Sequence, residues 1–253
     1  MSHIHIPDGV LPLWIILIGW VITGGLLLVA SRRLVGEELT RRLPLLAVMA
    51  TLMVGAQSVV LPPIGYHLNL TVLSGIILGP ALGIIAAFIV NLILAMVGHG
   101  GITVVGLNTL VFGAEMALGY YLFRGLRGAL RGRLGVGLAA GAATLLSLLA
   151  GTLLMIAVVA ASAVSPGWQM PHGPETLVLP NPFGEPTVIG RPEEADHGVS
   201  AQVQVGRFAI LVLFLGLIGW PLEAIVTGLV ARYLGSVWPD LLEPEGVQAR
   251  RSR

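Results

Sequence analysis

The chain has 253 residues, of which 55% are hydrophobic and 11% are charged, and its formal net charge is +1. Soluble domains carry about 25% charged residues, so this composition excludes an ordinary soluble protein and predicts a polytopic membrane protein. Cysteine is absent, which excludes disulfides and thiolate metal sites. All 14 basic residues are arginine. The chain therefore lacks the lysine of a phosphate-binding P-loop, and a partner must supply any ATP hydrolysis.

The start of the chain places histidines beside the terminal amine. If Met1 is removed, as the small Ser2 favours, the amine of Ser2 and the amide and ring nitrogens of His3 form fused chelate rings around one cation. A nitrogen plane of this kind suits Ni2+, Cu2+ or Co2+ better than tetrahedral Zn2+. If Met1 stays, the first three residues chelate by themselves, and His67 is redundant or axial. The alternative is an unstructured start with incidental histidines.

Apolar stretches of about 20 residues are long enough to cross the roughly 30 Å hydrocarbon core of a bilayer. Five such stretches run from 11 to 30, 43 to 62, 102 to 123, 134 to 164 and 206 to 234. A sixth apolar block, 68 to 98, is interrupted by Gly79-Pro80 and is either one tilted helix or two spans. A cleavable signal peptide is not expected, because the start has no basic region.

Arginine clusters at 32–42, 124–133 and 250–253 decide how often that block crosses. All three clusters should be cytoplasmic by the positive-inside rule, so the block must cross twice or not at all. We expect two crossings. The predicted fold is therefore an all-α bundle of about seven transmembrane helices, with the N-terminus outside and the C-terminus inside.

This topology predicts one transmembrane domain over 11–238, preceded by an extracytoplasmic metal-binding loop at 1–10 and followed by a cytoplasmic tail at 239–253. The acidic loop 165–205, rich in proline and glycine, is expected to be an outer, weakly structured excursion that carries His172 and His197. Small residues at Gly79, Gly83 and Ala87, and at Gly137 and Gly141, should permit close helix approach.

The same topology brings His67 and His99 to the outer face beside the N-terminus. Neutral imidazole is a common ligand of nickel and cobalt, so His67 would complete a four-nitrogen set with the terminal chelate. His99, flanked by glycines, is expected to hydrogen bond to the ligands, or else to be an ordinary loop histidine. Two acids, Glu115 and Glu223, fall within spans and should face the bundle interior or a partner. We favour packing or helix–helix hydrogen bonding for them over an ion pathway.

Several motifs resemble one known family, the CbiM/NikM substrate-binding membrane components of energy-coupling factor transporters. The motifs are, in order, His5-Ile6-Pro7-Asp8-Gly9-Val10-Leu11, Gly65-Tyr66-His67-Leu68-Asn69-Leu70 ahead of Gly79-Pro80, and Gly98-His99-Gly100-Gly101-Ile102-Thr103 through Asn108 and Thr109.

The resemblance implies a metal site made by the terminal amine, the amide and ring of an N-terminal histidine, and a downstream histidine, here His67. Alignment on Pro7-Asp8-Gly9 makes His5 the N-terminal ligand, whereas alignment on the processed terminus makes it His3. We favour His3, because only a residue near the free amine closes small rings. The resemblance also implies that Asn69, Thr103 and Asn108 support the ligands, although helix capping is an equal alternative.

The function that the resemblance implies is high-affinity capture of Ni2+ or Co2+ in a prokaryotic inner membrane, linked to cobalamin biosynthesis. The implied partners are a transmembrane coupling protein, cytoplasmic ATP-binding-cassette ATPases and a small accessory membrane subunit, with membrane lipid around them and no nucleic acid. One alternative is an intramembrane metalloenzyme, which the lack of a His-Glu-x-x-His motif disfavours. Another is a vitamin-binding component of the same transporter class, which would not need the N-terminal histidines.

Overall fold

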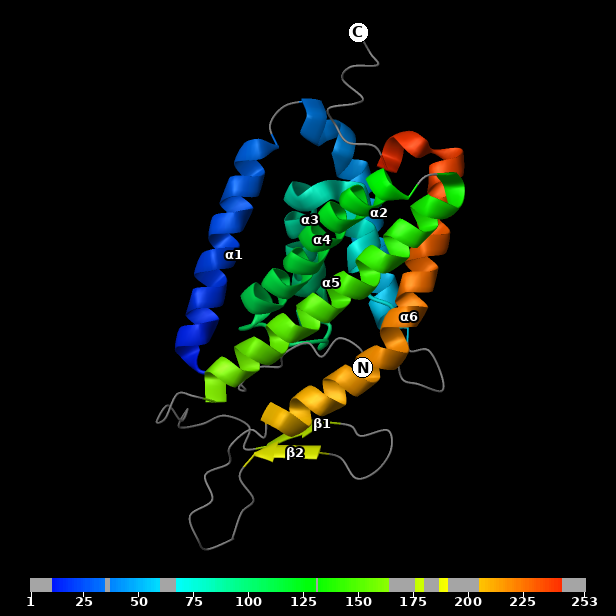
Figure 1. Cartoon of the computed structure of the whole chain (residues 1–253). Coiled ribbons are helices and arrows are strands. Elements are labelled where there is room, and N and C mark those ends of the chain that lie inside the picture. The colour runs from blue at the N-terminus through cyan, green and yellow to red at the C-terminus, as the bar shows by residue number, and fades with distance from the viewer. Residues whose placement is uncertain are drawn as a thin grey trace, which may run out of the picture.

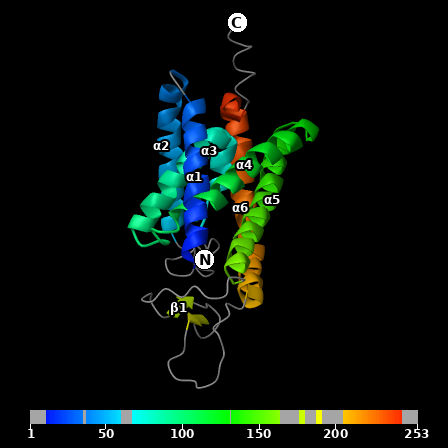
Figure 2. The same cartoon turned by 90° about the vertical axis from the view of Figure 1, so that its left-hand side faces the viewer.

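The computed structural model describes residues 11–34, 37–59, 67–130, 132–163, 176–179, 187–190 and 205–242. Within these ranges the chain forms a bundle of long α-helices (Figure 1, Figure 2). The helices are α1 (Leu13–Arg33), α2 (Glu37–Ser58), α3 (Thr71–Met96), α4 (Val105–Ala129), α5 (Gly132–Ala163) and α6 (Val205–Val237), and a 3-10 turn follows at Pro239–Leu242.

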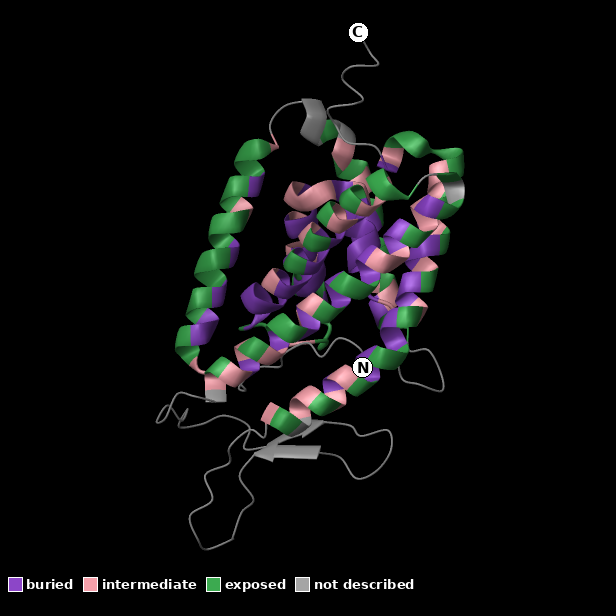
Figure 3. Cartoon of the chain, in the orientation of Figure 1, coloured by how far each residue is buried: buried purple, intermediate pink, exposed green. Residues whose placement is uncertain are grey.

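Four helical segments are long and apolar enough to cross a membrane, namely Leu13–Arg33, Thr71–Met96, Leu134–Ser162 and Phe208–Val237. Large apolar side chains on their outer faces are exposed, such as Val21 at 73% and Ile210 at 71%. Figure 3 shows the buried residues gathered between the helices and the exposed ones on the outside, most clearly along α1. Outward-facing apolar side chains suit lipid rather than water, so the prediction of a polytopic membrane protein is confirmed.

Helix α3 is broken in the middle. Gly79 has φ 75° and ψ 174° and precedes Pro80, a pair that combines the backbone freedom of glycine with the loss of one helical N–H donor. A straight helix of 26 residues would measure about 39 Å. The rings of His67 and His99, which flank α3, nevertheless lie 6.2 Å apart, so the chain enters and leaves α3 at the same end of the bundle.

Helix α3 begins and ends at the same end of the bundle, which agrees with the even number of crossings that the arginine clusters require of the 68–98 block. The described residues form six helices rather than seven, because the two segments of the 68–98 block join through Gly79 into one helix, α3, which is broken there. The first segment, 71–78, has a length of about 12 Å and is too short to cross the hydrocarbon core. A total of seven crossings stays a prediction.

Arg32, Arg33 and Arg127 lie at the end of the bundle opposite to His67 and His99. Arg32 and Arg33 lie in the last turn of α1, and Arg127, near the end of α4, donates to the carbonyl of Leu242 after α6 at 2.9 Å. Figure 1 places these helix ends in the upper part of the bundle, with the end of α1 at the left and those of α4 and α6 at the right. The assignment of the histidine end to the outer face stays a prediction.

Glycines let the helices approach at backbone distance. A Cβ at Gly75 would lie 2.4 Å from the carbonyl oxygen of Met116 in α4, and one at Gly137 would lie 2.9 Å from the carbonyl oxygen of Gly228. A Cβ at Gly141 would meet the Ala224 carbonyl at 3.1 Å. The predicted close approach at Gly137 and Gly141 is thus confirmed, and it joins α5 to α6.

The loop between α5 and α6 contains regular structure that the sequence did not suggest. Strands β1 (Thr176–Leu179) and β2 (Thr187–Gly190) form an antiparallel hairpin in which Thr176 pairs with Gly190. The prediction of a weakly structured loop was therefore wrong for these eight residues. Within the described ranges the fold is otherwise helical.

Candidate metal site

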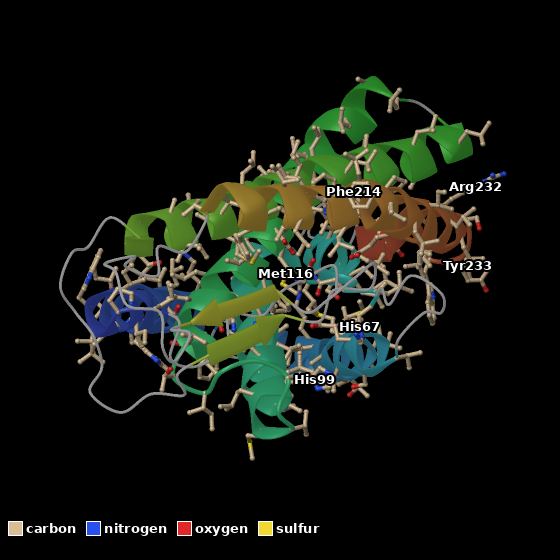
Figure 4. The ribbon with its side chains drawn as sticks, turned by 90° about the horizontal axis from the view of Figure 1, so that it is seen from below. His67, His99, Met116, Phe214, Arg232 and Tyr233 are labelled. Carbon is tan, nitrogen blue, oxygen red and sulfur yellow. The ribbon has the colours of Figure 1, made fainter. Side chains whose placement is uncertain are left out.

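Two histidines from separate loops meet at one end of the bundle. His67 lies just before α3 and His99 just after it, and their rings are arranged edge to face at an interplanar angle of 79° (Figure 4). The backbone N–H of His99 donates to the carbonyl of Leu94 at 2.8 Å. Its neighbours Gly98 and Gly100 have φ values of 83° and 101°, which only glycine adopts without strain, so these glycines turn the chain back toward His67.

The His67 ring is partly buried and held from α2. Its imidazole donates to the backbone carbonyl of Gln57, near the end of that helix. Burial lowers the pKa of His67, and His99 lowers it further, whereas the hydrogen bond to Gln57 raises it. The net direction is downward, which favours the neutral imidazole, the form that binds a metal ion.

The segment that carries His67, here named the 67–71 turn, runs from His67 to Thr71, the first residue of α3. Leu70 in this turn has φ 56° and ψ 14° and is the one non-glycine residue of the described chain with a positive φ. Leucine rarely adopts this left-handed conformation, because its Cβ crowds the backbone. The surrounding structure must therefore hold the turn in place.

Two buried carboxylates supply much of that support. Glu223 of α6 accepts hydrogen bonds from the backbone N–H of Leu70 at 2.9 Å and of Asn69 at 3.4 Å. Glu115 of α4 accepts from the hydroxyl of Thr71 at 2.8 Å and the side-chain amide of Asn69 at 3.2 Å. Both acids face the protein interior, as predicted, and are at most 1% exposed. The bond from Thr71, the first residue of α3, to Glu115 of α4 is a helix–helix hydrogen bond of the kind predicted, and the bonds from Asn69 and Leu70 join the two helices to the segment before α3.

Of the residues expected to support the ligands, Asn69 lies closest to His67 in the sequence and is fully buried. Asn108 is buried in the first turn of α4, where its N–H donates to the Val104 carbonyl. The carbonyl of Thr103 accepts from the indole of Trp20 at 2.7 Å. This bond and the one from Thr23 to the Gly106 carbonyl at 2.7 Å fasten α1 to the start of α4. The sequence analysis missed this contact, which no local pattern signals.

The other predicted ligands, Ser2, His3 and His5, lie outside the described residues, as do His172 and His197. In the ranges that the structure describes, no three histidine, aspartate or glutamate residues group together as metal ligands. The described part of the candidate site is thus the His67–His99 pair together with the rest of the 67–71 turn, in which Asn69 and Thr71 are buried.

Residues 5–241 match the family model described as "Cobalt uptake substrate-specific transmembrane region", named CbiM. The chain belongs to this family. The match covers more than half of the sequence, so the resemblance inferred from the motifs is confirmed. As a CbiM-family member, the chain is a transmembrane component of a metal-uptake transporter.

Relatives and solved structures agree with this assignment. A "Putative metal transport protein" of Haemophilus influenzae is 36% identical over 144 residues, which are 54% of this chain and 67% of that protein. A protein of the same description from Haloquadratum walsbyi is 37% identical over 131 residues, 49% of this chain and 59% of that protein. The crystal structure of a transition metal transporter and that of a truncated one superpose with TM-scores of 0.69 and 0.68. Each is 19% identical and covers 92% of this chain, with 93% and 98% of the solved chains matched, so the fold is shared.

Proposed function

We propose that this CbiM-family chain is the substrate-capture component of an energy-coupling factor transporter and binds Ni2+ or Co2+ at the histidine end of the bundle. The observation that carries the proposal is the His67–His99 pair, whose ring centroids lie 6.2 Å apart. Imidazole nitrogen is a preferred ligand for both ions. The broken α3 brings the pair together at the end of the bundle opposite to Arg32, Arg33 and Arg127.

The proposed ligand set combines His67 with the N-terminal residues. The amine of Ser2 and the amide and ring nitrogens of His3 would occupy three positions around the metal, and His67 the fourth. His5 is the alternative N-terminal ligand. His99 lies close enough to His67 to influence the orientation of its ring, which is a common role for groups beside metal ligands.

The proposed partners follow from the absence of an ATP-hydrolysing motif in this chain. The chain has no lysine and therefore no P-loop lysine. The proposed assembly supplies ATP hydrolysis through cytoplasmic ATP-binding-cassette ATPases, transmits it through a transmembrane coupling protein, and includes a small accessory membrane subunit. The proposed setting is a prokaryotic inner membrane.

Metal analysis of the purified, untagged protein tests this function. We expect about one equivalent of bound nickel or cobalt per chain and an intact mass that lacks Met1. The two measurements together report the identity of the metal and the state of the terminal amine. A protein that folds in detergent but binds neither ion at micromolar concentration would contradict the proposal and favour a vitamin substrate. Bound zinc together with hydrolytic activity would favour the metalloenzyme alternative.

A further inference from the structure

The 67–71 turn is held by acids from two helices that are distant in the sequence. Glu115 belongs to α4 and Glu223 to α6. Between them, four hydrogen bonds run from the turn to the two carboxylates. An additional bond joins the Asn69 amide to the Thr71 hydroxyl at 3.1 Å. The turn is thus fastened to the bundle through its own backbone as well as its side chains.

Glu223 has two side-chain oxygens, and they accept hydrogen bonds from two adjacent N–H groups of the turn. With Leu70 in the left-handed region, the N–H groups of Asn69 and Leu70 both point to the same carboxylate, one to each of its oxygens. Successive backbone N–H groups in such a turn form a concave site for an anion. Both hydrogen bonds are made with Leu70 in the left-handed conformation, so Glu223 favours this conformation of the turn over others.

The turn determines where His67 lies. Asn69 is two residues beyond His67, and α3 begins at Thr71 with a hydrogen bond from the Ser74 N–H to the Leu70 carbonyl at 2.9 Å. No regular secondary structure fixes residues 67–70. The position of His67 therefore depends on the contacts of Asn69, Leu70 and Thr71 with the two acids, as well as on the hydrogen bond from its ring to the Gln57 carbonyl.

We propose that Glu223 and Glu115 are positioning residues of the metal site, which hold the strained 67–71 turn in the conformation that presents His67 to the metal. This inference rests on the proposed function, because it assumes that His67 is a ligand. It assigns the buried acids to the organisation of the site, and neither of them touches the metal. Loss of such support typically weakens metal binding by about 10- to 100-fold.

The first test replaces Glu223 and measures two properties of the protein. In the metal-free protein, hydrogen–deuterium exchange of the amides at 69–71 should accelerate in Glu223→Ala, since two of these N–H groups lose their acceptor. With Ni2+ or Co2+ as the probe, the affinity of Glu223→Ala should fall by about 10- to 100-fold. Its metal absorption spectrum should shift toward that of His67→Ala. Glu223→Gln retains one acceptor oxygen and should restore part of both properties.

Thr227→Val is the matched control. Thr227 lies one turn further along α6 and is fully buried, and its hydroxyl has no hydrogen-bond partner among the described residues. Valine has nearly the same shape, so exchange at 69–71 and metal affinity should both stay at wild-type values.

A second variant leaves both acids in place and tests the proposal if Glu223→Ala fails to insert. A Cβ at Gly151 of α5 would lie 2.2 Å from a carboxylate oxygen of Glu115, so Gly151→Ala must displace that side chain. Alanine favours a helix over glycine, and the helix itself should persist. The control is Gly25→Ala, because a Cβ at Gly25 has no neighbour within 4 Å. Gly151→Ala should weaken metal binding, and Gly25→Ala should not.

The outcomes separate this proposal from the proposed function. Accelerated exchange together with weakened binding in Glu223→Ala or Gly151→Ala supports positioning. If hydrogen–deuterium exchange is unchanged, the positioning proposal is overturned. It is also overturned if exchange accelerates but the metal affinity is unchanged, and in both cases the proposed capture of the metal stands. If the wild-type protein binds neither ion, the proposed function falls, and the acids then have no metal ligand to position.

Discussion

The ring centroids of His67 and His99 lie 6.2 Å apart although the whole of α3 separates the two residues in the sequence. The break at Gly79-Pro80 makes this possible, because it returns the chain to the end from which it started. The fold of α3 therefore brings the two histidines together. We expect His67 and His99 to differ in how much each contributes to metal binding.

The first prediction separates these two contributions. His67→Ala removes a proposed ligand and should weaken Ni2+ or Co2+ binding by more than the roughly 10- to 100-fold expected for loss of a residue that only supports a ligand. His99→Ala should fall within that smaller range. Competition titration with a chromogenic chelator measures both. His172→Ala and His197→Ala are the controls and should bind like the wild type, and equal losses in all four variants would show that the downstream ligand is misassigned.

The second prediction concerns the terminal amine. Acetylation of the N-terminus, or a tag fused to it, should abolish high-affinity metal binding, because an acylated nitrogen cannot close the chelate rings with His3. The protein should still insert and fold, since α1 begins only at Leu13. Circular dichroism and thermal unfolding would verify the fold. Undiminished binding by the tagged protein would exclude the amine as a ligand.

The third prediction uses two helical glycines in different surroundings. Gly75→Ala should lower stability by about 1–3 kcal/mol, because its Cβ would lie 2.4 Å from a backbone carbonyl that cannot move aside easily. Gly25→Ala should be neutral or stabilising by up to about 1 kcal/mol, since alanine favours a helix and nothing obstructs it. Thermal unfolding in detergent compares them. Equal stability of the two variants would mean that α3 and α4 do not pack as closely as the structure has them.

Much of this fold could be predicted from the sequence because its signals are local or additive. Apolar length marks the helices, and the arginine clusters required the 68–98 block to return, as α3 does at Gly79. That parity predicted that His67 and His99 lie at the same end of the bundle, but it did not predict that their rings are 6.2 Å apart. Close contact of α5 with α6 followed from Gly137 and Gly141, although many glycines elsewhere in the chain carry the same spacing by chance.

The support of the site could not be predicted, because it depends on tertiary structure. Leucine has no local preference for the left-handed region, so nothing in the sequence marks Leu70 as a strained turn residue. Glu115 and Glu223 were correctly expected to face the interior. Their partners at 69–71, however, lie 44 to 154 positions away in the sequence, and no periodicity connects residues at such distances.

The last prediction concerns the energy source for uptake. It follows from the absence of a P-loop lysine and from the hydrogen bonds that Glu115 and Glu223 make. In proteoliposomes the isolated chain should bind Ni2+ or Co2+ from the histidine face, hydrolyse no ATP and show at most slow uptake. A metal ion bound tightly by four nitrogen ligands is released only when the geometry of the site changes. Glu115 and Glu223 accept hydrogen bonds from the 67–71 turn and so do not serve as further ligands along a path through the bundle. Adding the coupling protein and the ATPases should make uptake fast and dependent on ATP, which radioactive metal counting would follow. Rapid uptake by the chain alone, driven by a membrane potential or a proton gradient, would contradict this account, because the two acids would then have to serve as steps of an ion pathway.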